Sequence, residues 1–115
     1  MKINNVELDD LDLFDLDTAA KVEDAINVLE EKENESELSG LGLADVIRQK
    51  CQFIFDFFNE VWGEGTDKKV FGEKTNVKEC YKAFAQVIEK IGQSKSELES
   101  ITLKYSSNRA QRRGK

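Results

Sequence analysis

The side chains best suited to chemistry in this sequence are acidic and lie near its start. Between residues 9 and 17, five aspartates are interleaved with leucines and a phenylalanine, a spacing that resembles the oxygen ligands of a calcium loop. An EF-hand loop also needs a central glycine and a bidentate glutamate at its end, and this segment has neither. We therefore interpret residues 9–17 as an edge strand with an acidic outer face.

The two cysteines, Cys51 and Cys80, are too far apart for the CxxC spacing of zinc knuckles and redox motifs. Each lies on the apolar side of a predicted helix, where a free cysteine behaves as a small hydrophobic residue. We expect two thiols in the core, with a disulfide as the alternative.

Other catalytic patterns are also missing. The sequence has no histidine, which removes the commonest general base and metal ligand. The segment 63–65 reads Gly-Glu-Gly and lacks the third glycine and the Lys-Ser/Thr of a phosphate-binding loop. Carboxylates are so frequent that chance explains their proximity. We predict no catalytic, cofactor-binding or metal site, and a protein that is not an enzyme.

The central element of the predicted fold is a helix from Leu43 to Trp62. At 3.6 residues per turn its apolar side chains cover about 200° of the circumference, so other elements must cover it on two sides. Gly63 and Gly65 supply its end. This helix either forms the centre of the core or leaves part of its aromatic surface, such as Phe53 and Phe57, exposed for docking.

Three further helical segments are predicted around this helix. An acidic helix begins near Asp17 or Thr18 and runs to about Glu35, and residues 66–71 form a single turn closed by Gly72. Asn76 caps a third long helix that ends at Gly92, and a shorter helix opens at residue 94.

We predict a mainly α fold with three main helices, an N-terminal hairpin or arm and a C-terminal helix. The Asn-Asn pair at residues 4–5 suits a tight hairpin. One domain spans residues 1–106, with the hairpin or arm in residues 1–16. Residues 107–115 lack an apolar anchor and are predicted to form a basic, flexible tail.

The charge is unevenly distributed. Residues 1–40 hold 3 basic and 13 acidic side chains, a net charge of -10, whereas residues 41–115 have a net charge of +4. The overall charge of -6 makes nucleic acid an unlikely partner, since the basic tail allows only weak, nonspecific contact. No segment has the roughly 20 apolar residues of a membrane span, so we expect a cytoplasmic protein with no membrane contact.

Several segments resemble small tail proteins of bacteriophages that infect Gram-positive bacteria, in particular their tail assembly chaperones. The resemblance covers roughly residues 1–92. It rests on the opening segment 1–8, the helix start at 15–21, the segment Phe-Asp-Phe-Phe-Asn-Glu-Val-Trp-Gly-Glu-Gly-Thr at 55–66, and Lys-Val-Phe-Gly at 69–72. These signatures are structural and none is catalytic.

The resemblance implies a chaperone that binds the helical tape measure protein, or other tail proteins, in the host cytoplasm. The partner helix would lie in a groove between the second and third long helices. Candidate groove residues are Phe53, Phe57, Trp62 and Phe71, each of which could instead belong to the core. Similar proteins form oligomers, and the charge asymmetry is compatible with head-to-tail contacts between copies.

Two other functions remain open. A structural joining protein would have similar properties but would stay in the finished virion. An acidic protein that mimics DNA and blocks a host enzyme would need a continuous acidic face, which the positive balance of residues 41–115 dilutes.

Overall fold

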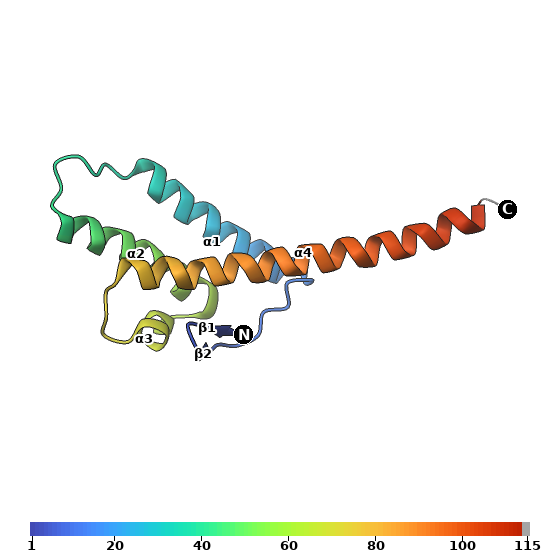
Figure 1. The fold of residues 1–115 in the computed structure, drawn as a ribbon, viewed down its shortest axis with the longest axis horizontal. Coiled ribbons are helices and arrows are strands. Elements are labelled where there is room, and N and C mark those ends of the chain that lie inside the picture. The colour runs from blue at the N-terminus through green and yellow to red at the C-terminus, as the bar shows by residue number, and fades with distance from the viewer. Residues whose placement is uncertain (114–115) are drawn as a thin grey trace.

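The computed structural model describes residues 1–113, and the side chains of residues 1–104. It is mainly helical with a short N-terminal hairpin, as the sequence predicts (Figure 1). In chain order the elements are β1 (Lys2–Ile3), β2 (Val6–Glu7), α1 (Leu16–Glu35), α2 (Leu43–Trp62), α3 (Thr66–Phe71) and α4 (Val77–Arg113).

The hairpin turns at the Asn-Asn pair. Asn4 and Asn5 have φ angles of 48° and 64°, which asparagine tolerates better than most residues, and the strands pair antiparallel. The Asn4 backbone N–H donates to Gln86 Oε1 at 2.8 Å, and Ile3 is fully buried. The hairpin is therefore fastened to α4.

The acidic segment after the hairpin is not the edge strand that we predicted. Residues 8–15 contain no strand, and Asp15 caps α1 by accepting a hydrogen bond from the Thr18 N–H at 3.2 Å. The helix therefore begins slightly earlier than predicted. Closely spaced aspartates lack the β-branched side chains that favour strands, and they suit helix caps and turns.

The central helix has the predicted bounds. α2 runs from Leu43 to Trp62 and packs against α1, α3 and α4. Gly63 ends it with a φ of 110°, and its N–H donates to the Asn59 carbonyl at 2.9 Å. The core forms around this helix, and Cys51, Ile54 and Phe58 are fully buried.

The short helix α3 and the start of α4 also match the sequence prediction. α3 is a short helix that ends at Gly72, whose φ is 65°. Asn76 Oδ1 accepts hydrogen bonds from the backbone N–H groups of Lys78 and Glu79 at 3.0 and 3.2 Å.

α4 is longer than we predicted. It continues through Gly92, where we predicted an end, and its helical backbone includes residues 107–113 of the predicted basic tail. Residues 114–115 lie outside the described residues. An interior glycine costs a helix only about 1 kcal/mol relative to alanine when its φ stays negative, as it does at Gly92. No glycine or proline lies between residues 93 and 113 to stop the helix.

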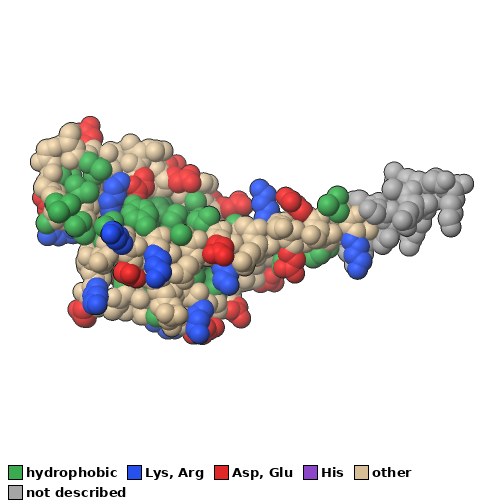
Figure 2. All heavy atoms as spheres, in the orientation of Figure 1, with side chains coloured by type: hydrophobic (Ala, Val, Ile, Leu, Met, Phe, Trp, Pro, Cys, Tyr) green, Lys and Arg blue, Asp and Glu red, His purple; other side chains and the backbone are tan. Residues whose placement is uncertain are grey.

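The molecule consists of a helical body and a projecting helix. Its principal extents are 68 × 31 × 22 Å, and the long dimension follows α4 beyond the body (Figure 1). All described side chains from Lys95 to Lys104 are exposed. From here on we call residues 95–113, the projecting end of α4, the arm; the N-terminal segment is called the hairpin. Figure 2 shows a band of hydrophobic side chains over the body and isolated ones along the arm.

No helix among the described residues is long and apolar enough to cross a membrane.

Candidate functional site

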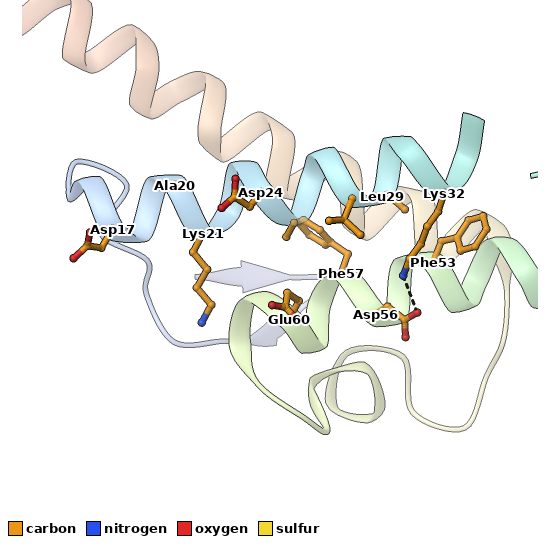
Figure 3. Close-up of a pocket in the computed structure, with 12 residues that line it drawn as sticks. Asp17, Ala20, Lys21, Asp24, Leu29, Lys32, Phe53, Asp56, Phe57 and Glu60 are labelled. Atoms are coloured by element: carbon orange, nitrogen blue, oxygen red, sulfur yellow. Dashed lines mark hydrogen bonds and ion pairs between the residues drawn. The ribbon is translucent and has the colours of Figure 1, made fainter. Parts of the chain in front are cut away.

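A groove of about 520 Å³ lies between α1 and α2 (Figure 3). Each helix contributes one face along several turns. The lining residues are Asp17, Ala20, Lys21, Asp24, Ala25, Val28, Leu29 and Lys32 from α1, and Phe53, Asp56, Phe57 and Glu60 from α2.

The floor of the groove is apolar. Leu29 and Phe57 are buried there, whereas Val28 is 48% exposed and Phe53 is partly buried. Val28 and Phe53 thus keep apolar surface in contact with solvent. An elongated apolar surface between two helices suits another helix that packs its own apolar stripe against it.

The rim of the groove is charged and predominantly acidic. Four carboxylates, those of Asp17, Asp24, Asp56 and Glu60, line the groove together with two lysines, Lys21 and Lys32. Lys32 Nζ donates to Asp56 Oδ2 at 3.2 Å across the groove, and both side chains are substantially exposed (Figure 3). Solvent screening makes this ion pair weak, so it can open at little cost when a ligand enters.

Two of the four predicted binding residues lie in this groove. Phe53 and Phe57 line it. Trp62 instead stacks on Phe58 with ring centroids 5.4 Å apart, and its Nε1–H donates to the Asp9 carbonyl at 2.9 Å. Phe71 packs against Phe55 and Phe58, with centroids 5.2 and 5.6 Å away. Both residues therefore support the core, and Trp62 also fixes the N-terminal segment.

The groove does not lie between the second and third long helices, where we predicted it. The space between α2 and α4 is filled by side chains: Phe57 and Phe84 pack edge to face with centroids 5.1 Å apart, and Cys51 and Cys80 are fully buried. Close packing at this contact leaves no room for a partner helix.

Sequence reasoning missed the α1 wall of the groove. Its residues Asp17, Lys21, Asp24, Val28 and Lys32 recur every three or four positions, so they share one helix face. That face is mostly charged, and a charged face ordinarily indicates contact with solvent. The one available signal was Val28, a large apolar residue on this mostly charged face.

A polar cluster near the C-terminal end of α1 has a structural role. Glu33 accepts hydrogen bonds from Lys50 of α2 and from the Tyr81 hydroxyl of α4. Burial, followed by the contact with Glu33, raises the pKa of Tyr81. The neutral phenol thus remains a donor at physiological pH, and the cluster joins three helices.

The cysteines are free and buried, as the sequence predicts, and no disulfide joins them. Burial raises the pKa of the Cys80 thiol, and the neighbouring Cys51 adds to this effect. A protonated, inaccessible thiol is a poor nucleophile. Within the described part of the chain, no three Cys, Asp or Glu side chains are arranged to hold a metal ion.

The sequence profile of one family, described as a family of unknown function (DUF6673), matches residues 4–115. The chain belongs to the DUF6673 family. The match begins at the turn of the hairpin and spans β2, both walls of the groove and the arm, so these features lie within the matched region. No curated protein and no solved structure matches this DUF6673 chain.

Proposed function

We propose that this protein is a non-enzymatic tail assembly chaperone that holds an amphipathic helix of a phage tape measure protein in the α1–α2 groove. The observation that carries the proposal is the groove itself, whose apolar floor between two helices is open to solvent at Val28 and Phe53. Two helices that present such a floor offer a third helix a place to pack.

The proposal commits to a partner of particular chemistry. The floor favours a helix with apolar side chains at i, i+3 or i+4 and i+7, which bury their surface against Leu29, Phe53 and Phe57. The excess of carboxylates on the rim favours lysines or arginines beside that stripe. The resemblance to phage tail proteins supports the tape measure protein as the source of the helix, and the host cytoplasm as the place of action.

Affinity capture from phage-infected or induced cells tests this proposal. The tagged wild-type chain is compared with Val28→Lys, which places a long cation in the groove, and with Asn27→Lys, which makes the same change at the neighbouring exposed position outside it. We expect the wild type and Asn27→Lys to retain the tape measure protein and Val28→Lys to lose it. Equal capture by all three chains would contradict a role for the groove.

Purified virions provide the second part of the test. A chaperone leaves the assembly, so the chain should be missing from finished particles. Its presence in virions would favour a structural joining role. Capture of a host nucleic-acid enzyme alone would favour the acidic mimic of DNA.

A further inference from the structure

The arm presents apolar side chains that nothing in the same chain covers. Leu98 and Ile101 are 50% and 42% exposed. Leu98 extends the seven-residue spacing of Phe84 and Ile91, which pack against the body, and Ile101 follows Leu98 by three residues. On a helix these positions lie on one face. The face that packs against the core in the first half of α4 therefore continues, uncovered, into the arm.

The arm cannot fill the groove of its own chain. α4 is a single helix through Gly92, and the arm points away from the body (Figure 1). The groove is formed by α1 and α2 in the body (Figure 3). An arm that enters a groove must therefore come from a second molecule.

The arm and the groove have opposite charge. Residues 95–113 contain five basic and two acidic side chains, a net charge of +3. Residues 16–35, which form α1, contain seven acidic and two basic side chains, a net charge of -5. Two arms would repel each other, whereas an arm and an α1 helix attract.

The lengths are also compatible. At 1.5 Å per residue, the α1 face from Asp17 to Lys32 spans about 22 Å and residues 95–113 span about 27 Å. The arm is thus long enough to lie along the whole groove, with Leu98 and Ile101 turned toward its floor.

We propose that the arm of one molecule docks in the α1–α2 groove of a second copy, in a head-to-tail contact. The inference rests on the proposed function, because the same groove would hold the partner helix. Self-association and partner binding then compete for one site. A head-to-tail contact leaves one groove and one arm free on each pair, so it can continue into a ring or a chain.

Mixing two differently blocked variants tests this contact. Val28→Lys blocks the groove and leaves the arm intact, while the double variant Leu98→Glu/Ile101→Glu alters the arm and leaves the groove intact. All three positions are exposed, so both proteins should fold, which circular dichroism checks. By sedimentation velocity, we expect the wild type to associate, each variant alone to be a monomer, and an equimolar mixture to form a 1:1 heterodimer.

Two outcomes would overturn the inference. If Val28→Lys alone associates as strongly as the wild type, the arms pair with each other rather than with the groove. If the wild type is a monomer throughout a micromolar concentration series, no such contact exists. Association that weakens as salt rises would support the charge complementarity.

Failure of the inference can be told apart from failure of the proposed function. Capture of the tape measure protein by the arm variant uses the groove alone. If the groove holds the partner helix and the arm competes for it, the arm variant captures more than the wild type. Equal capture would contradict competition but keep the proposed function. Heterodimer formation without capture would keep the contact and reject the tape measure protein.

Discussion

Phe58 is the aromatic residue on which the core depends most. It is fully buried, packs edge to face with Phe57 and Phe71, and stacks on Trp62. Replacing it with alanine removes all three contacts and leaves a cavity. We expect Phe58→Ala to lower the free energy of unfolding by about 3–5 kcal/mol in urea denaturation. A loss below about 1 kcal/mol would show that the centre of the core lies elsewhere.

Phe53 and Phe57 both line the groove but differ in their role in folding. Phe57 is 3% exposed and packs on Phe58 and Phe84, whereas Phe53 is only partly buried. We expect Phe57→Ala to reduce both stability and capture of the partner. Phe53→Ala should lower the free energy of unfolding less than Phe57→Ala and still weaken capture. Equal losses of stability would assign Phe53 to the core.

The buried thiols should not react in the folded protein. Cys51 and Cys80 are fully buried, so a thiol reagent cannot reach them in the folded protein. Burial also raises the pKa of Cys80, which keeps this thiol in its less reactive, protonated form. With the thiol reagent DTNB near neutral pH, we expect no rapid labelling of the native chain and labelling of both cysteines in urea. Rapid native labelling would show that α2 and α4 separate readily.

Tyr81 should make stability sensitive to alkaline pH. Its pKa is raised in the folded state, so its contribution is complete below the ordinary value of 10.0 and is lost as the pH rises through the higher folded value. Unfolding in urea at about pH 8 and about pH 11 should therefore show a smaller loss for Tyr81→Phe than for the wild type. Identical losses would show that ionisation of Tyr81 does not contribute to this pH dependence.

Two glycines affect neighbouring helices in opposite ways. Gly63 ends α2 with a φ of 110°, which strains any other residue, while Gly92 lies inside α4 with a negative φ and open space around it. Gly92→Ala should stabilise the helix by up to about 1 kcal/mol and slow amide hydrogen exchange in residues 93–104. Gly63→Ala should destabilise the protein. Faster exchange in Gly92→Ala would contradict a continuous α4.

Local sequence signals predicted where most helices begin and end, but they did not predict that α4 is one continuous helix. Gly63, Gly72 and Asn76 mark ends and starts that the structure confirms, because each position needs a particular φ or a capping oxygen. Gly92 has no such requirement, so its apparent stop signal was wrong. The separate helix that we predicted to open at residue 94 is likewise absent, because α4 continues through this position.

The candidate binding surface was harder to predict than the fold. Periodicity placed Phe53 and Phe57 on the broad apolar arc of α2, but an arc of this width does not reveal which neighbour covers each part. In the structure α4 closes one side through Phe84, and α1 covers the other side incompletely, so a groove remains. Its location depends on packing between helices that are distant in sequence.

The whole molecule combines an acidic body that carries an apolar groove with a basic arm that carries an apolar stripe. These two features lie on different parts of the chain, and one continuous helix keeps them apart (Figure 1). On this account the groove is the functional centre, for the partner helix and for the arm of another copy.

Site-specific photo-crosslinking at Val28 tests this account most directly. A photoreactive residue at position 28 faces the groove, and the same residue at position 27 lies outside it and serves as the control. After irradiation in infected cells, we expect position 28 to give crosslinks to an amphipathic helical segment of the tape measure protein and to residues 95–113 of a second copy, and position 27 to give neither. Equal crosslinking at both positions, or none at position 28, would contradict the groove as a helix-binding site.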